Sequence, residues 1–209
     1  MSVIVDLREE AFTPRQQQVL TAALELLVES GASLTMTAVA RRASCSKETL
    51  YKWFGDRDGL LTATVQWQAA KVRVPRVDRH RVDSDELRES IEQFARDLLA
   101  TLAGEISVTL NRLAVTHAGD EKTDLGMIVL ENGRLEMGRR LKPVLEAGRD
   151  ARLLRFDSSE EAYRTFFGLV VRDVQIRLLL GDHIELTPAD IDRDAKLATE
   201  QFLTLYERR

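Results

Sequence analysis

The stretch LTMTAVARRASCSKETLYKWFGDRDGLL, residues 34–61, decides the fold of this chain. It predicts two short helices joined by a tight turn and followed at once by a third, because apolar residues recur at i, i+3 and i+4, the spacing of one helix face. These residues are Met36, Val39, Ala40 and Ala43 in the first helix and Leu50, Trp53 and Phe54 in the second. Thr35 and Ser46 stand just ahead of the two helices, where a hydroxyl can cap the first free N–H groups.

The opposite face of the second helix is polar. It carries Lys47, Glu48, Thr49, Tyr51 and Lys52. An apolar side fixes such a helix to the helices beneath it, and its polar side can reach base edges and phosphates in a major groove. The pattern therefore predicts a recognition helix.

In the order of its residues, this part of the chain resembles the N-terminal DNA-binding domain of TetR-family transcriptional regulators; the resemblance runs over about fifty residues, from the first expected helix to the start of the fourth. The resemblance is carried by Thr35, Val39-Ala40, the turn at 43–46, Thr49-Leu50-Tyr51, Phe54, Arg57-Asp58 and Leu60-Leu61. Ser44 and Cys45 replace the Gly and aliphatic residue usual in the family's turn, and Arg57 stands where Lys is commoner. Because a left-handed conformation suits Gly better than Ser, the turn departs most from the family's pattern.

The resemblance also implies how DNA would be contacted. Phosphates would be held by Tyr51, Lys52 and Arg57, and by Thr35 and Thr37 at the start of the preceding helix. Such contacts position a protein without reading sequence. Lys47, Glu48 and Thr49 remain as candidates for base edges, since Lys suits guanine and a carboxylate can accept from cytosine.

The net charge of −4 fits a nucleic-acid partner only if the positive charge is local. Residues 35–82 hold 10 Lys+Arg against 4 Asp+Glu, a balance of +6, whereas residues 84–209 hold 18 against 24, or −6. A basic patch beside the helix pair is the electrostatic footprint expected on DNA. A chance split on solvated faces is the alternative.

With 209 residues, 44% of them hydrophobic and 31% charged, the chain has ample length for a core. No apolar run approaches the roughly 20 residues that span a bilayer, and the first residues lack the features of a signal peptide. The single cysteine, Cys45, cannot form an intramolecular disulfide, which fits a reducing compartment. A cytoplasmic location is therefore expected.

The first helix is expected over residues 14–30, with Gly31 ending it. Gly55 should close the recognition helix, and Asp56 should cap a fourth helix that runs from Arg57 toward Val72.

Two segments outside these helices could also meet nucleic acid. Residues 1–13 predict a loose arm, where Arg8 and the neighbouring Arg15 could touch DNA unless the terminus is simply frayed. Residues 71–83, KVRVPRVDRHRVD, are basic and interrupted by Pro75; a solvated connector between two domains is the alternative interpretation.

From Ser84 onward the spacing predicts helices only. A long helix is expected from near Glu121 to Gly148. The segment EEAYRTFFGLVVRDVQIRLLL, residues 160–180, should form a helix that is buried on several sides, because its first half is apolar nearly all the way round. Asp157 or Ser158 would cap it.

The last helix opens at residues 187–190, Thr-Pro-Ala-Asp, which combine a cap, a first-turn proline and an acid at N3. We therefore expect an all-α fold with a helix-turn-helix domain at residues 1–60 and a larger helical regulatory and dimerisation domain at residues 61–209.

The C-terminal part is similar to the regulatory domain of AefR-type members of the family. The features are Leu110-Asn111-Arg112-Leu113, the turn at 148–154, the FFGLVV segment and Phe202-Leu203. The family usually dimerises through its last two helices. The apolar residues between 166 and 176 offer more surface than one small core needs; they are Phe166, Phe167, Leu169, Val170, Val171, Val174 and Ile176. A homodimer is expected, with a fully buried helix in a monomer as the alternative.

A mostly apolar effector pocket is expected between these helices. Its candidate residues are Trp67, Phe94, Leu98, Arg112, Leu113, His117, Phe166 and Val170, with Arg112 as a polar anchor. For each apolar one, plain core packing is the alternative. A ligand would release a palindromic operator by favouring dimers whose DNA-binding domains are wrongly spaced for the two half-sites. Activation or corepression remains open.

Catalysis is not expected. His80, His117 and His183 show no metal-ligand spacing with one another or with Cys45, and no cofactor is implied. No nucleophile elbow, P-loop or dinucleotide fingerprint is present. A helical module that binds ligands or proteins without DNA is the remaining alternative.

Overall fold

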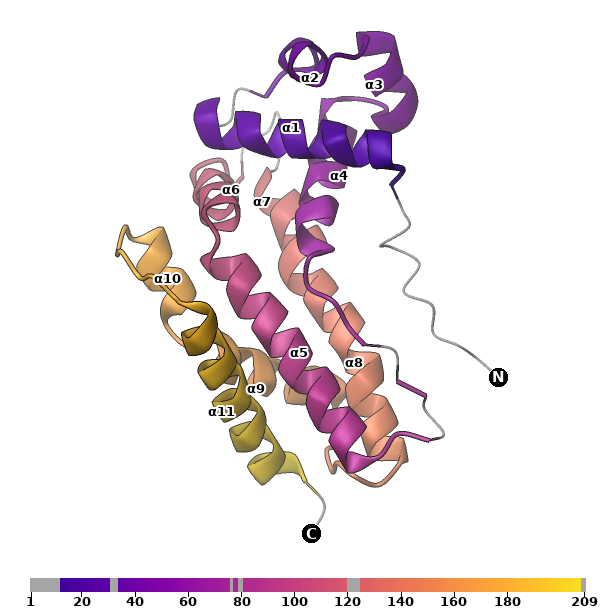
Figure 1. Ribbon diagram of the computed structural model, residues 1–209, viewed down its shortest axis with the longest axis vertical. Coiled ribbons are helices and arrows are strands. Elements are labelled where there is room, and N and C mark those ends of the chain that lie inside the picture. Colours follow the sequence, from indigo (N-terminus) through magenta and orange to yellow (C-terminus); the bar gives the residue numbers. More distant parts are fainter. Residues whose placement is uncertain (1–11, 31–33, 76, 79–80, 120–124, 208–209) are drawn as a thin grey trace. The chain divides into compact units, whose positions relative to one another are not determined.

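The computed structural model describes residues 12–30, 34–75, 77–78, 81–119 and 125–207. The described part is helical, which confirms the all-α prediction, and Figure 1 shows the order of its helices. The helices are α1 (Pro14–Ser30), α2 (Met36–Arg42), α3 (Lys47–Phe54), α4 (Arg57–Ala69), α5 (Ser84–Ala103), α6 (Glu105–Thr116), α7 (Leu125–Val129), the π-helix η1 (Leu130–Arg134), α8 (Leu135–Asp150), α9 (Ser159–Val171), α10 (Val174–Leu179) and α11 (Pro188–Tyr206).

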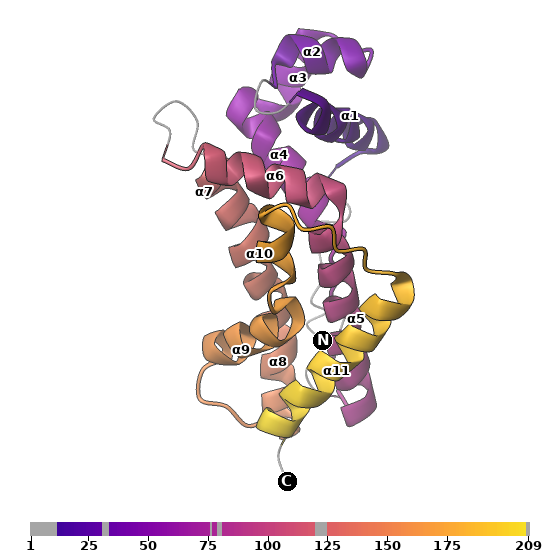
Figure 2. The ribbon, with the colours of Figure 1, turned by 90° about the vertical axis from the view of Figure 1, so that its left-hand side faces the viewer.

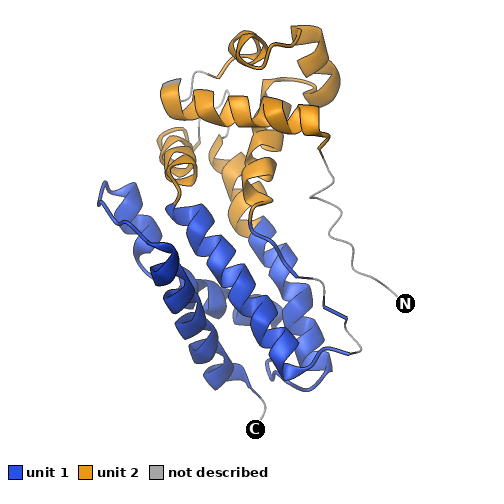
Figure 3. Ribbon diagram, viewed as in Figure 1, with its two compact units in different colours: residues 1–6, 72–103, 136–209 blue, residues 7–71, 104–135 orange. Residues whose placement is uncertain are grey.

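Two compact units make up the chain (Figure 3). Unit 2 comprises the described residues within 7–71 and 104–135, and unit 1 those within 72–103 and 136–209. These units reflect which helices pack together: α4 packs against α1 and α7 inside unit 2. The predicted boundary between a DNA-binding domain at residues 1–60 and a regulatory domain at residues 61–209 stays a prediction.

The core of unit 2 forms around the inner face of α1, which packs on α2, α4 and α6. Its fully buried side chains include Leu20, Leu24 and Leu27 from α1 together with Leu50 of α3 and Leu60 of α4. Burying each such leucine contributes about 1.5–3 kcal/mol. α2 and α3 are too short to be stable alone, so this core holds them in place.

The predicted helix starts are confirmed wherever the structure describes them. Ala38 donates its N–H to the Thr35 hydroxyl at 3.1 Å, and Thr49 donates to the Ser46 hydroxyl at 3.1 Å. Gly59 donates to the Asp56 carboxylate at 2.8 Å. Gly31, the expected end of α1, lies outside the described residues.

In unit 1, α11 packs against α5 and α9, and Figure 2 shows it running obliquely past α5. Three buried rings join these helices: the centroids of Phe94 and Phe166 are 6.3 Å apart, and those of Phe166 and Phe202 are 5.2 Å apart. Ser158 caps α9, and Thr187 with Asp190 forms the capping box of α11. Both caps agree with the sequence.

Two expected helices differ from the structure. α8 continues past Gly148 to Asp150, so the prediction that this glycine ends the helix is wrong. The expected start near Glu121 lies outside the described residues. The segment 160–180 is also not one helix, because Arg172 takes a φ of 46° and divides it into α9 and α10.

No single helix in the described part of the chain is long and apolar enough to cross a bilayer; α5 and α6 pass that test only when taken together.

Candidate nucleic-acid interface

α3 separates its residues into a buried side and an exposed side, as the sequence predicts. Leu50 is fully buried, and Trp53 and Phe54 are half-buried with their ring centroids 6.1 Å apart. Lys47, Glu48, Tyr51 and Lys52 are exposed, whereas Thr49 is half-buried. Leu50 and the two rings thus anchor a helix whose other side offers cations and hydrogen-bonding groups.

The three candidate base-reading residues have different local surroundings. The Thr49 hydroxyl lies 3.1 Å from the Ser46 hydroxyl within the cap. Hydrogen bonds to the carboxylate from its own backbone N–H and from Ser46 hold the pKa of Glu48 below its usual value, and Lys47 adds a smaller effect. Lys47 itself makes no ion pair or hydrogen bond with a described residue. Of the three, Lys47 is the one best placed to reach a partner.

At the start of α2, Thr35 and Thr37 are both exposed, and the Thr35 hydroxyl caps the helix. Arg57, expected at a phosphate, is half-buried and donates from Nε to the Leu34 carbonyl oxygen at 2.9 Å. Its Nη1 lies 3.6 Å from the Asp58 carboxylate. Arg57 therefore holds the helix-turn-helix together, a role that sequence spacing did not indicate.

Positive charge remains on this face after local pairing. Arg42 is bound by Glu29 and Glu25 of α1. The hydrogen bond between Arg42 and Glu29 lowers the pKa of Glu29 and raises that of Arg42. Lys52, by contrast, is exposed and makes no ion pair with a described residue. Lys47 and Lys52 of α3 thus carry exposed positive charge without an ion pair in the described residues, whereas Arg42 is paired.

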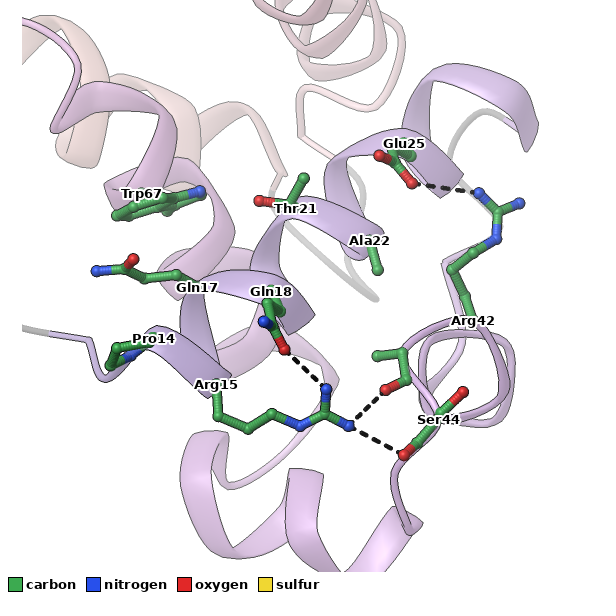
Figure 4. Close-up of a pocket in the computed structure, with 11 residues that line it drawn as sticks. Pro14, Arg15, Gln17, Gln18, Thr21, Ala22, Glu25, Arg42, Ser44 and Trp67 are labelled. Atoms are coloured by element: carbon green, nitrogen blue, oxygen red, sulfur yellow. Dashed lines mark hydrogen bonds and ion pairs between the residues drawn. The ribbon is translucent and has the colours of Figure 1, made fainter.

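The turn between α2 and α3 adopts a left-handed conformation at Ser44, where φ is 50°. The Cys45 N–H closes the turn on the Ala40 carbonyl at 2.9 Å. Arg15 lies in the first turn of α1 rather than in a frayed end, and its Nη2 donates to the carbonyl oxygens of Ala43 and Ser44 (Figure 4). Residue spacing does not indicate this contact, because the partners of Arg15 are backbone atoms almost thirty positions away.

The expected effector residues are found in both units. Phe94, Leu98, Phe166 and Val170 are buried in the core of unit 1. In unit 2, Trp67 and Leu113 are half-buried, Arg112 is exposed, and His117 is the C-cap of α6.

The described residues form two open cavities that bear on this set. One, of about 680 Å³, lies along α1 and is lined by Arg15, Ser44 and Trp67 among others. The other, of about 980 Å³, lies between residues 155–162 and the end of α11. Trp67 is the one candidate that lines either cavity, so an effector pocket formed by the other residues stays a prediction. The described residues also hold no cluster of three or more His, Cys, Asp or Glu side chains that could bind a metal.

A helix-turn-helix with an exposed cationic second helix belongs to the class of sequence-specific DNA-binding modules. Residues 19–64 match the family model of bacterial regulatory proteins of the tetR family, and residues 89–208 match the C-terminal domain of AefR-like transcriptional repressors. The chain belongs to the TetR family of transcription regulators, which is not a family of enzymes.

Solved structures extend the similarity over nearly the whole chain. A TetR transcriptional regulator from Agrobacterium tumefaciens is 49% identical, with a TM-score of 0.80 over 95% of this chain and 97% of that chain. The flavonoid-responsive regulator FrrA is 28% identical, with a TM-score of 0.67 over 93% and 98% of the two chains. The regulator BetI of Paraburkholderia phytofirmans is 39% identical over 66 residues, which cover 28% of this chain and 34% of BetI.

Proposed function

We propose that the protein is a homodimeric repressor that holds a palindromic operator with two copies of α3 and leaves it when a small, largely apolar effector binds. The observation that carries this proposal is the exposed face of α3, where Lys47, Tyr51 and Lys52 surround a helix anchored by Leu50. The AefR-like repressor match over residues 89–208 supports repression as the mode. A chain that binds chromosomal DNA works where that DNA is, so the expected cytoplasmic location is part of the proposal.

The contacts divide into positioning and reading. Phosphates are held by Thr35, Thr37, Tyr51, Lys52 and Arg57, and bases are read by Lys47, Glu48 and Thr49. Lys47 is the leading reader, because its ammonium group is exposed and suits the acceptors of guanine. Thr49 contributes less, since its hydroxyl is already engaged with Ser46.

Exposed apolar side chains support dimerisation through the last helices. Ile176 and Leu180 belong to α10 or its end, and Leu197 and Leu205 to α11; all four are exposed in the single chain. Covering such side chains with a second copy removes apolar surface from water, at roughly 25 cal/mol per Å². A C2 dimer would present two α3 helices to two half-sites.

The effector proposed is an aromatic, phenolic compound. FrrA, which resembles this chain over most of its length, is described as flavonoid-responsive. Within unit 1, the rings of Phe94 and Phe166, whose centroids are 6.3 Å apart, would supply aromatic surface to such a compound. The effector releases DNA only to the extent that it binds the released form more tightly.

Selection from a random DNA library with the purified protein, at about physiological salt, tests DNA recognition. Enrichment of a palindrome supports the proposal. Retention on heparin that is lost at moderate salt, without any enriched site in the presence or absence of flavonoids, would instead support a module that lacks a specific operator.

The enriched duplex then serves as the probe for the effector. Members of a flavonoid panel should dissociate the complex, whereas aliphatic carboxylic acids, which serve as controls, should not. The reason is that only the flavonoids match the proposed aromatic site. If a flavonoid is required for binding, the protein is a corepressor-dependent regulator. Release by the aliphatic acids alone would contradict the aromatic effector.

A further inference from the structure

Arg15 connects α1 to the turn that orients α3. Its Nη2 donates to the carbonyl oxygens of Ala43 at 2.7 Å and Ser44 at 3.0 Å, and its Nη1 donates to the Gln18 side-chain oxygen at 2.8 Å (Figure 4). One planar guanidinium thus joins three oxygens from two segments that lie far apart in sequence. Such a fork has a fixed geometry, which a lysine ammonium lacks.

The turn that Arg15 binds is under conformational strain. Ser44 takes a φ of 50°, a region in which the side chain of an L-residue is crowded and glycine is not. The turn's own backbone bonds run from the Ala43 N–H to the Val39 carbonyl at 2.8 Å and from the Cys45 N–H to the Ala40 carbonyl at 2.9 Å, with a longer one, at 3.3 Å, from Ser44 to Arg41. The Ala43 and Ser44 carbonyl oxygens that Arg15 binds are not the acceptors of these backbone bonds, so the guanidinium is an additional restraint on the left-handed residue.

We propose that Arg15 is a positioning residue for DNA recognition: it holds the α2–α3 turn in its left-handed form and thereby sets the direction of α3, without contacting DNA itself. This inference rests on the proposed function for its consequence at the operator. Its structural part, the restraint on the turn, is independent of any DNA.

The chain contains a natural reporter for the turn. Cys45 is its only cysteine, follows Ser44 directly and is half-buried. Its reaction with a thiol reagent under native conditions measures how often the turn opens, provided the rate exceeds that allowed by global unfolding. Arg15→Ala should raise this rate about ten-fold, the scale of one lost charge-assisted hydrogen bond. Alanine is the best helix former, so α1 is not weakened by the substitution itself.

Two control variants separate the restraint from charge and from backbone strain. Arg41→Ala removes an exposed cation from α2 but no side-chain bond to the turn, and should leave the Cys45 rate within about two-fold of wild type, as is usual for surface substitutions. Ser44→Gly removes the strain. In that background Arg15→Ala should therefore raise the Cys45 reaction rate by clearly less, because the effects of neighbouring restraints are coupled. Arg15→Lys should recover only part of the wild-type protection.

Binding to a duplex enriched by the wild-type protein provides the functional measurement. Arg15→Ala should weaken this binding about ten-fold and leave random DNA binding and the salt dependence unchanged, because no phosphate contact is lost. Equal losses on both DNAs with a salt slope reduced by about 1 would instead show a phosphate contact and overturn the inference.

An unchanged Cys45 rate in Arg15→Ala would also overturn the inference. If the wild-type protein enriches no duplex, the proposed function fails, while the Cys45 rates still decide whether Arg15 restrains the turn.

Discussion

The Nε of Arg57 donates to the carbonyl oxygen of Leu34 at 2.9 Å, across 23 positions of sequence. Leu34 directly precedes the N-cap of α2, and Arg57 is the first residue of α4. This hydrogen bond therefore links the residue before the helix-turn-helix to the residue at the start of α4, on the surface that carries the proposed phosphate contacts.

Replacing Arg57 should lower the stability of the protein. Arg57→Ala leaves the Leu34 carbonyl without this donor and should lower the free energy of unfolding by about 1 kcal/mol, because the site is half-buried and water can partly replace the donor. Lys52→Ala removes an equal charge from an exposed position and should leave stability within about 0.5 kcal/mol. Urea denaturation of the two variants measures the difference. Equal stabilities would contradict a structural role for Arg57.

Tyr51 provides the opposite case, because its side chain is 53% exposed on α3. Tyr51→Ala should weaken binding to every DNA sequence by roughly ten-fold, the worth of about one hydrogen bond to a phosphate, with no change in unfolding. Comparing the library profiles of variant and wild-type protein measures this. A changed base preference would show that Tyr51 reads bases.

Two glycines of α8 should be intolerant of a methyl group. A Cβ at Gly138 would lie 2.8 Å from the ring of Tyr163, and one at Gly148 would lie 2.7 Å from a methyl group of Leu87. Alanine at either position should therefore destabilise the protein by about 1–3 kcal/mol. Gly168→Ala in α9 is the matched control, because nothing lies within 4 Å of its Cβ position. It should stabilise by up to about 1 kcal/mol. Thermal unfolding that ranks Gly168→Ala with the other two would contradict this account.

These glycines also show why helix starts could be predicted from the sequence, whereas the end of α8 could not. A cap such as Ser46 or Asp56 acts on an N–H three residues away, so its effect is written in the local sequence. Gly148 suggested a helix end, because the low helix propensity of glycine can be read from the local sequence. The reason for a glycine here is instead the close approach of Leu87, some sixty positions earlier, which leaves no room for a Cβ.

The proposed DNA-binding face also combines features set by the local sequence with features set by residues distant in sequence. The polar side of α3 could be predicted from spacing, because helical periodicity alone determines which residues share a face. The bonds of Arg15 and Arg57 to backbone carbonyls could not, because every residue offers a carbonyl and only the fold selects one. The break at Arg172 was hidden for a related reason: its φ of 46° is unusual for arginine, and no glycine marked it.

The capping box of α11 should make stability depend on acid pH. Bonds from the Thr187 hydroxyl and backbone N–H, with Arg193 next, hold the pKa of Asp190 below its usual 3.8. Because the folded state lowers this pKa, its stabilising effect is present above pH 3.8 and is lost as pH falls through the lower folded value. An NMR titration of the carboxyl group should show this lowered pKa, and Thr187→Ala should move it back toward 3.8. A pKa unaffected by that substitution would contradict the assignment.

The proposed dimer can be disrupted at two of its exposed apolar side chains. Leu180 is 80% exposed after α10, and Leu205 is 63% exposed on α11. An aspartate at either position would bury an unpaired charge in an apolar interface, so Leu180→Asp and Leu205→Asp should each weaken dimerisation by roughly 100-fold. Their folding should be unchanged, because both side chains already contact water in the single chain.

Val115 on α6 is 69% exposed but lies outside these helices, which makes Val115→Asp the matched control. Size-exclusion chromatography with light scattering should show monomers for the two leucine variants and dimers for wild type and Val115→Asp. The leucine variants should also lose operator affinity, because each monomer then binds a half-site alone. A wild-type monomer at micromolar concentration would contradict the dimer. Dimers in all four proteins would place the interface on another surface.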